Sequence, residues 1–231
     1  MNKLTVALPK GRLFDPAVEI LEQAGLINRE LDDDSRKLVL ADPKEEVDFI
    51  LSKAVDVQTY VEHGVADFGI AGKDILLEAG ATVCEVVDLG LSKCRLVVAV
   101  PEEVGITELG QLPPTGRVAT KYPNVAKEFF KKQGVQIEIV KLNGSIELAP
   151  LIGLADMIVD ITSTGTTLRE NDLIEIAEIA KSSARLIVNK VSYKASHERI
   201  KGIIEQVKEV VDRKNLRADF FITKGSKNPE G

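Results

Sequence analysis

Short apolar runs alternate with amphipathic segments along most of the chain. The apolar runs, which are typical of short strands, lie at residues 4–8, 37–41, 47–51, 67–71, 84–89, 95–100, 117–121, 136–140, 157–161 and 185–189. Apolar residues at three- and four-residue spacing predict helices near residues 16–24, 55–62, 73–79, 124–133 and 193–211, and others that begin near 145 and 167. Strands that alternate with helices predict an α/β fold with parallel sheets covered by helices.

Two segments depart from this alternation. Residues 102–116 hold three glycines and two prolines and are expected to form a loop, and the polar residues 223–231 are expected to be disordered. Parallel sheets bind ligands at the carboxyl ends of their strands. We therefore expect the chemistry of this protein in the loops that lead from a strand into a helix.

The richest of these loops follows the apolar run at 157–161. It consists of Thr162, Ser163, Thr164, Gly165, Thr166 and Thr167. Gly165 permits a tight turn, and hydroxyls with backbone N–H groups at a helix N-terminus favour an anion such as a single phosphate. Asp160, just before the loop, can accept hydrogen bonds from two vicinal hydroxyls such as those of a ribose. The alternative is an ordinary helix cap, which needs only one hydroxyl.

A second loop follows the run at 4–8 and carries two cations. Lys10 and Arg12 flank Gly11, so the backbone can approach a ligand between two positive side chains, which favours a polyphosphate. The alternative is a solvated basic turn. Arg36 and Lys53 each stand at one end of an expected strand and are less specific candidates.

Two further strand-to-helix loops give weaker signals. Gly72 leaves a strand end without a side chain, and Lys73 and Asp74 then open a helix, where Asp74 equally suits the helix dipole. Glu147 falls in the first turn of a helix that Ser145 is expected to cap. Its carboxylate either serves that first turn or faces a ligand.

Composition narrows the possible functions. The 231 residues carry a net charge of −6, with 44% hydrophobic and 29% charged residues, as in a soluble globular protein with no overall field for nucleic acid. No apolar run approaches the roughly 20 residues of a membrane span, and the N-terminus lacks a signal-peptide core, so we expect a cytoplasmic protein. Cys84 and Cys94 are expected to be free thiols, and the aspartates at 32–34 a solvated loop. With two histidines, a zinc site or a histidine-based triad is not expected.

Four segments together carry a family resemblance. They are LPKGRL at 8–13, YVEHG at 60–64 with DFGIAGKDILLE at 67–78, DLGLSKCRLVVAVP at 88–101, and MIVDITSTGTTLREN at 157–171. In this combination and order the chain resembles ATP phosphoribosyltransferase, the first enzyme of histidine biosynthesis. The resemblance extends over roughly the first 200 residues.

The resemblance implies two α/β lobes like those of type II periplasmic binding proteins, with the active site in the interlobe cleft. Residues 1–94 plus 184–231 would form one lobe, and 95–183 the other, which holds the phosphate loop. About twenty residues follow the last expected helix, which fits the short form of the family and is too few for a C-terminal regulatory domain. The short form implies a homodimer and a complex with a separate regulatory subunit related to histidyl-tRNA synthetase.

The implied reaction is attack by N1 of the adenine of ATP on C1 of phosphoribosyl pyrophosphate, with Mg²⁺ as cofactor and pyrophosphate as leaving group. The loop at 162–167 would hold the 5′-phosphate and Asp160 the ribose hydroxyls. The cations expected to meet the pyrophosphate are Lys10, Arg12, Arg36 and Lys53. Glu147 would bind the ribose or the Mg²⁺ shell, and Gly72 with Lys73 the phosphates of ATP.

One position departs from the family pattern, and two other functions remain open. Lys53 stands where family members often carry arginine, so it keeps the charge but loses the bidentate fork. A solute-binding or sensor module of the same architecture would use similar loops without catalysis. A phosphoribosyltransferase acting on another base would have the same phosphate loop.

Overall fold

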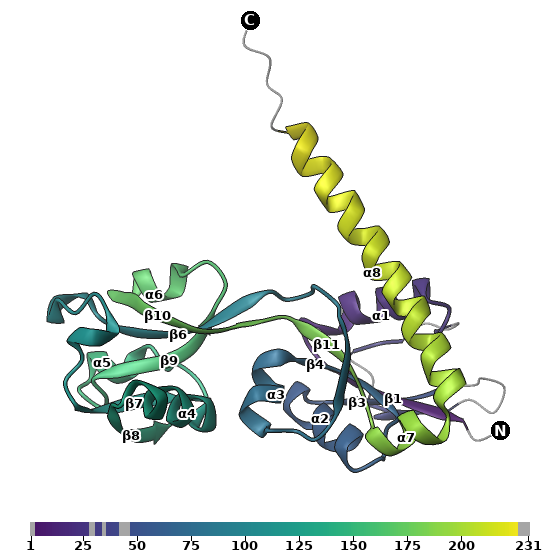
Figure 1. The fold of residues 1–231 in the computed structure, drawn as a ribbon, viewed down its shortest axis with the longest axis horizontal. Coiled ribbons are helices and arrows are strands. Elements are labelled where there is room, and N and C mark those ends of the chain that lie inside the picture. The colour runs from purple at the N-terminus through teal and green to yellow at the C-terminus, as the bar shows by residue number, and fades with distance from the viewer. Residues whose placement is uncertain (1–2, 28–30, 34–35, 42–46, 226–231) are drawn as a thin grey trace, which may run out of the picture. The chain divides into compact units, whose positions relative to one another are not determined.

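The computed structural model describes residues 3–27, 31–33, 36–41 and 47–225, which form two compact units (Figure 1). Unit 1 comprises residues 1–72, 81–91 and 184–231, and unit 2 comprises residues 73–80 and 92–183. Each unit contains one β-sheet. The division differs from the expected lobes chiefly at residues 73–80, which lie in unit 2.

The described part of unit 1 contains a six-stranded sheet in the order β2-β3-β1-β4-β11-β5. The strands are β1 (Leu4–Pro9), β2 (Val39–Leu40), β3 (Val47–Ser52), β4 (Phe68–Gly72), β5 (Cys84–Asp88) and β11 (Ala184–Val188). β1 is parallel to β3 and β4, whereas β2 is antiparallel to β3, and β11 is antiparallel to β4 and β5. The expected parallel pairing therefore holds for β3, β1 and β4, and the sheet as a whole is mixed.

The three longer helices in the described part of unit 1 bury apolar side chains, whereas the six-residue helix has no buried residue. They are α1 (Phe14–Gln23), α2 (Ala54–Glu62), α7 (Lys190–Ala195) and α8 (His197–Gly225). α1 and α8 lie side by side (Figure 1), and Lys214 of α8 pairs with Glu19 of α1 at 2.9 Å. Phe14 of α1 and Ile200 and Val207 of α8 are fully buried in one core.

The C-terminal part of the chain differs from the expected single helix at 193–211. α7 ends before Ser196 and α8 begins at His197 and continues to Gly225, so residues 223–225 are helical and not part of a disordered tail. The rest of that predicted tail, residues 226–231, lies outside the described residues. No helix in the described ranges is long and apolar enough to cross a membrane.

A glycine brings α2 close to the central sheet of unit 1. A Cβ atom on Gly69 of β4 would lie 2.7 Å from Val61 Cγ2 and 2.8 Å from Val57 Cγ1, two fully buried side chains of α2. Real Cβ atoms do not approach that closely, so a larger residue would push the helix off the strand. Gly69 therefore has a packing role.

The described part of unit 2 contains a five-stranded sheet in the order β10-β6-β9-β7-β8. The strands are β6 (Cys94–Pro101), β7 (Thr115–Thr120), β8 (Gln136–Lys141), β9 (Met157–Thr162) and β10 (Leu173–Ser182). β7 is parallel to β8 and β9, whereas β6 is antiparallel to β9 and β10. The sequence pattern assigned no strand to β10.

The remaining elements of unit 2 are mostly short. They are α3 (Lys73–Ala79), α4 (Pro123–Gln133), α5 (Leu148–Leu151), α6 (Thr166–Glu170) and two 3₁₀ turns, Glu102–Val104 and Leu109–Gln111. The two 3₁₀ turns lie in the segment that was expected to be a loop.

Polar contacts hold α3 in unit 2. The buried carboxylate of Asp74 accepts hydrogen bonds from Ser182 Oγ at 2.8 Å and from Tyr122 Oη at 3.0 Å. At the other end of α3, the Glu78 carboxylate accepts from the backbone N–H groups of Asn124 and Val125 at 2.9 and 3.1 Å. Glu78 thus satisfies N–H groups in the first turn of α4 that have no partner within the helix. These bonds explain why residues 73–80 belong with unit 2.

Candidate active site

The carboxyl end of β9 in unit 2 is surrounded by polar and basic residues. β9 ends at Thr162, which pairs with Arg95 of β6, and Arg95 in turn pairs with Lys181 of β10. Lys121 directly follows β7, the parallel neighbour of β9. Hydroxyls and cations therefore gather at one edge of this sheet, where ligands of such sheets bind.

The loop from Thr162 to Thr167 is a tight turn held by its own hydroxyls. Gly165 adopts a φ of +73°, and its N–H donates to Thr162 Oγ1 at 2.9 Å. The hydroxyls of Thr164 and Thr166 lie 3.0 Å apart, and the N–H of Thr166 makes a long 3.4 Å bond to Thr164 Oγ1. The loop thus exists as a formed cluster of donors, with Ser163 and Thr167 exposed beside it.

The helix after this loop is shorter than the anion-binding argument assumed. α6 has five residues, and Gly165 at its N-cap makes no side-chain bond. A single helical turn contributes little macrodipole. The hydroxyls and N–H groups of the loop, more than a helix dipole, are therefore what can hold an anion here. The N-cap position itself is glycine, but the hydroxyls of Thr162 and Thr164 accept from N–H groups at the start of the helix, as a Ser/Thr cap would.

Asp160 is a half-buried carboxylate just before the loop. Burial raises its pKa, the N–H of Ile161 that donates to Oδ1 at 2.8 Å lowers it, and the charge of Glu147 raises it further. The positive charge of Lys121 lowers this pKa and the charge of Asp74 raises it. These opposing effects show that Asp160 lies within electrostatic reach of two other carboxylates and one lysine.

The phenol of Tyr122 is influenced both by Asp74, to which it is hydrogen-bonded, and by the charge of Asp160. Burial raises the pKa of Tyr122, and so do the charge of Asp74, the hydrogen bond to Asp74 and the charge of Asp160. The phenol therefore stays protonated and donates to Asp74. The buried bonds of Tyr122 and Ser182 give Asp74 a fixed position at the start of α3, next to Lys73.

The side chain of Glu147 makes no capping hydrogen bond to a helix. α5 has only four residues, and Glu147 occupies its N-cap without a side-chain hydrogen bond. The expected cap by Ser145 is wrong: Ser145 has a φ of +48°, and its carbonyl, not its hydroxyl, accepts from Leu148 N at 3.2 Å. The Glu147 carboxylate is half-exposed and acts on Asp160 through its charge.

Unit 1 gathers its cations at the carboxyl edge of its parallel strands. Lys10 follows β1 and Lys53 follows β3, and Lys10 N donates to Ser52 O at 2.8 Å. Arg36 precedes β2, which runs antiparallel to β3, so it falls at the same edge. Arg12 is exposed in the turn after Lys10.

Asp33, which was expected to lie in a solvated loop, contacts the basic turn at 10–12. Gly11 has a φ of +87°, and its N–H donates to Asp33 Oδ2 at 2.8 Å. The other oxygen, Asp33 Oδ1, is buried and has no hydrogen-bond partner among the residues that the structure describes. The expectation of a solvated loop is therefore wrong for Asp33, whereas Asp34 lies outside the described residues.

Gly72 and Lys73 stand where the chain passes from unit 1 to unit 2. Gly72 is the last residue of β4, and Lys73 is the first of α3, with its N–H bonded to Ser183 O at 3.0 Å. The side chain of Lys73 is half-buried.

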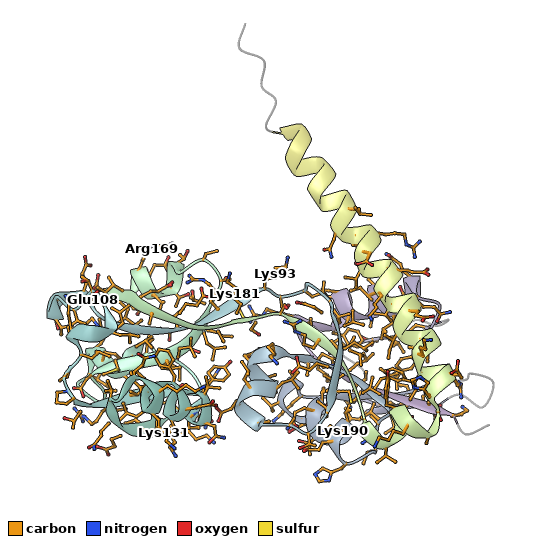
Figure 2. The ribbon with its side chains drawn as sticks, viewed as in Figure 1. Lys93, Glu108, Lys131, Arg169, Lys181 and Lys190 are labelled. Carbon is orange, nitrogen blue, oxygen red and sulfur yellow. The ribbon has the colours of Figure 1, made fainter. Side chains whose placement is uncertain are left out.

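Sequence reasoning missed several residues of these edges. Lys121 and Tyr122 come directly after a strand and before a helix, so the rule that selected the other loops would have found them. Arg169, on α6 (Figure 2), was visible as a cation four residues after Gly165. No local signal pointed to Asp33 or to the buried role of Asp74.

The described residues hold no cluster of three or more His, Cys, Asp or Glu side chains that could bind a metal ion. Mg²⁺ rarely needs such a cage, because it binds through one or two carboxylates, water and substrate phosphates. Asp160 and Glu147, whose charge raises the pKa of Asp160, are a donor set of that kind. The residues present therefore fit a substrate-borne Mg²⁺.

Comparisons with known proteins identify the family of this chain. The family model described as ATP phosphoribosyltransferase matches residues 53–209. An ATP phosphoribosyltransferase of Halothermothrix orenii is 53% identical over 217 residues, which are 93% of this chain and 97% of that protein. The structure titled "ATP phosphoribosyl transferase (HisG:HisZ) complex from Thermotoga maritima" is 35% identical, has a TM-score of 0.79, and covers 91% of this chain and 99% of that one.

A more distant structural likeness concerns the fold alone. The substrate-binding protein of an amino acid ABC transporter has a TM-score of 0.59 at 16% identity, with 97% of this chain and 99% of that chain covered. This supports the expected α/β fold of type II periplasmic binding proteins. The family match and the identity to a full-length relative decide the assignment: this chain belongs to the ATP phosphoribosyltransferase family.

Proposed function

We propose that this chain joins ATP and 5-phosphoribosyl 1-pyrophosphate to give N1-(5-phosphoribosyl)-ATP and pyrophosphate, the first step of histidine biosynthesis. Family membership supports the reaction. The structural observation that carries it is the hydroxyl loop at 162–167, formed around a positive-φ glycine beside the half-buried Asp160. Such a pair matches a ribose 5-phosphate, with the loop on the phosphate and the carboxylate on the diol.

In unit 2 we assign the 5′-phosphate to the hydroxyls and N–H groups of Thr162 to Thr167. We assign the ribose 2- and 3-hydroxyls to Asp160, because a carboxylate accepts two hydrogen bonds from a vicinal diol. Glu147, whose side chain makes no capping hydrogen bond, is a second acceptor for the ribose hydroxyls. Lys121 offsets part of the negative charge that these two carboxylates create.

In unit 1 we assign the pyrophosphate to the basic edge formed by Lys10, Arg12, Arg36 and Lys53. Phosphate oxygens attract such cations, and arginine can bind them through two parallel hydrogen bonds. Gly72 and Lys73 are assigned to the phosphates of ATP. Because the whole chain carries a net charge of −6, binding of two polyanionic substrates requires that the positive side chains dominate locally at the site.

The chemistry needs orientation more than a reactive side chain. The lone pair of adenine N1 forms the new bond to C1 of the ribose, and the C1–O bond breaks with its electron pair leaving on pyrophosphate. No proton has to be removed from N1, so no general base is required. Holding both substrates in line can contribute about 7–11 kcal/mol, and cations stabilise the leaving group.

Mg²⁺ bound to the substrate phosphates would supply further charge neutralisation on the leaving pyrophosphate. The side chains that fit its coordination shell are Asp160 and Glu147. We place the reaction in the cytoplasm, where its two substrates are made. We also propose a complex with a regulatory subunit, because the structural relative was solved as a HisG:HisZ complex. That this subunit resembles histidyl-tRNA synthetase, and that the chain forms a homodimer, are proposed from the family resemblance alone.

The test is a turnover assay with purified protein, ATP, phosphoribosyl pyrophosphate and Mg²⁺, with pyrophosphatase added to draw the reaction forward. The near-ultraviolet absorbance of the phosphoribosylated adenine reports the rate, and mass spectrometry identifies the product. We expect turnover that histidine does not inhibit in the chain alone. A panel of other bases tests for a different phosphoribosyltransferase. No turnover with or without the regulatory subunit would contradict the proposal and favour a binding module.

A further inference from the structure

Arg169 contacts the hydroxyl loop from the helix that follows it. Its Nη1 donates to the carbonyl oxygen of Thr164 at 3.0 Å, and its Nη2 donates to Thr166 Oγ1 at 3.1 Å. Figure 2 labels this arginine on α6, at the surface of unit 2. The two nitrogens of one planar guanidinium therefore fix two groups of the loop, one on the backbone and one on a side chain.

Gly165 makes room for this arrangement. A Cβ atom at Gly165 would lie 2.9 Å from Arg169 Nη1 and 3.1 Å from Glu175 Oε1. The guanidinium thus occupies the place that any side chain at position 165 would need. Glu175 is held in turn by Arg95, whose Nη1 and Nη2 donate to its two oxygens at 2.8 and 3.0 Å. The approach of Arg169 to the loop is set by its surroundings as well as by its own rotamer.

The contact to Thr166 changes what that hydroxyl can do. An accepted N–H occupies one lone pair of Oγ1, so the hydroxyl proton must point to another acceptor. The neighbouring Thr164 Oγ1, 3.0 Å away, is one such acceptor, and a phosphate oxygen is another. Because the donor is a charged guanidinium, the bond also polarises the hydroxyl and strengthens it as a donor.

We propose that Arg169 is a positioning residue for phosphate binding: it fixes the Thr164 carbonyl and presets the Thr166 hydroxyl as a donor to the 5′-phosphate. This proposal rests on the assignment of the loop to that phosphate. Arg169 acts through Thr166, not as a separate contact to the substrate. Its loss should weaken the binding of ribose phosphates and leave ATP binding and the fold unchanged.

The test compares Arg169→Gln and Arg169→Lys with a matched control, Arg117→Gln. Arg117 is also an exposed arginine of unit 2 that donates to a backbone carbonyl, Gly153 O at 3.1 Å, but it lies near the start of β7 and off the loop. We expect Arg169→Gln to raise KM for phosphoribosyl pyrophosphate about tenfold, as for loss of a charged hydrogen bond. KM for ATP and kcat should change by less than about twofold, and Arg169→Lys should recover part of the loss, since it keeps one charged donor.

A double-mutant cycle separates positioning from direct contact. If Arg169 acts largely through Thr166, adding Arg169→Gln to Thr166→Val should raise KM for phosphoribosyl pyrophosphate by much less than Arg169→Gln does in the parent, because only the bond to the Thr164 carbonyl remains to be lost. Additive losses would overturn the proposal, and so would equal KM values for Arg169→Gln and Arg117→Gln. Thermal unfolding of each variant should stay within about 2 °C of the parent, as for surface substitutions.

A binding readout distinguishes failure of this proposal from failure of the proposed function. Ribose 5-phosphate should raise the unfolding temperature of the parent protein, and this shift should be reduced in Arg169→Gln and kept in Arg117→Gln. A parent without transferase activity that still shows this pattern would contradict the reaction and support the role of Arg169. Absence of any ribose 5-phosphate shift in the parent would overturn the role of Arg169.

Discussion

The two loops that follow β1 and β9 are similar turns that are held by different hydrogen bonds. Each leads from a parallel strand into a helix, and each turns at a glycine with positive φ, +87° at Gly11 and +73° at Gly165. The N–H of Gly165 bonds to Thr162, three residues earlier, whereas the N–H of Gly11 bonds to Asp33, 22 residues later. One turn is closed by its own sequence, and the other depends on a distant carboxylate.

The two glycines also differ in how closely other side chains approach them. A Cβ atom at Gly11 would meet none of the described residues within 4 Å, whereas one at Gly165 would meet Arg169 and Glu175. The basic turn thus has open space for a large, highly charged ligand, while the hydroxyl loop is closely surrounded. We expect the basic turn to attract its ligand through long-range charge interactions, which salt screens. We expect the hydroxyl loop to bind through short directional hydrogen bonds, which salt does not screen. Breaking each loop should therefore give effects of different size and salt dependence.

The largest effect is expected for Asp160→Asn, beside the hydroxyl loop. Loss of one charge-assisted acceptor for the ribose should lower kcat/KM for phosphoribosyl pyrophosphate about 10²–10³-fold, as for one transition-state hydrogen bond. Steady-state kinetics at saturating ATP measures this. A decrease of less than about threefold would remove Asp160 from the site.

The same variant should be more stable than the parent at neutral pH. Burial raises the pKa of Asp160 in the folded protein, so the stability linked to its protonated form is complete below the unfolded pKa of about 3.9 and is lost as pH rises through the folded pKa. Asparagine cannot ionise and escapes this loss. The unfolding temperature of Asp160→Asn should exceed that of the parent at pH 7–8, and the difference should shrink toward pH 4. An unfolding temperature below the parent's at pH 7–8 would contradict the burial argument.

The next largest effect is expected for Gly165→Ala. A left-handed φ costs a residue with a Cβ about 1–2 kcal/mol, and the new methyl group would displace the Arg169 guanidinium from the loop. We expect KM for phosphoribosyl pyrophosphate to rise about tenfold or more. Gly134→Ala is the matched control in unit 2, because Gly134 has the same φ of +73° and a Cβ there would meet no described residue within 4 Å. Similar kinetics for the two alanine variants would show that the closeness around Gly165 has no functional meaning.

The sequence predicts those features of the fold and the site that depend on contacts between residues close together in the chain. It does not predict features that depend on distant partners. The hydroxyl loop was found from six adjacent residues because its turn is closed within them. The basic turn was found, but Asp33 was not, because a contact across 22 residues leaves no local pattern. The order of strands, and the placement of α3 in unit 2 through Asp74 and Glu78, likewise depend on distant partners.

The missed strand β10 has a specific physical cause. Its charged residues Glu175, Glu178 and Lys181 recur every third position and are all exposed, a spacing nearer to a helix than to the two-residue alternation of a strand. The pairing with β6 slips between Glu175 and Ala177 and again between Glu178 and Ala180. Each slip is a bulge that adds one residue and so returns every third side chain to the same face. Pattern reading without knowledge of the bulges cannot assign this strand.

On the basic turn, Asp33→Ala should have a smaller effect than the changes at the hydroxyl loop. It removes the acceptor that fixes Gly11 N–H, so Lys10 and Arg12 lose part of their orientation. A fall in kcat/KM of about fivefold is expected, typical of one hydrogen bond. Asp33→Asn keeps an oxygen acceptor and is the matched control, expected near the parent value. If both variants lose activity equally, the charge of Asp33 matters and its bond to Gly11 does not.

The smallest effect, and the only gain in ligand binding, is expected for Lys53→Arg. Lys53 is exposed at the N-cap of α2 and makes no side-chain capping bond, so arginine should fit there without disturbing the helix. Its planar fork can bind a phosphate through two hydrogen bonds where lysine offers a point charge. Because the site is exposed, inhibition by pyrophosphate should tighten only about two- to threefold, and less at high salt. Lys132→Arg, at an exposed pair with Glu128 in unit 2, should leave this inhibition constant unchanged. An unchanged constant in Lys53→Arg as well would remove Lys53 from the pyrophosphate contacts and leave the basic edge to Lys10, Arg12 and Arg36.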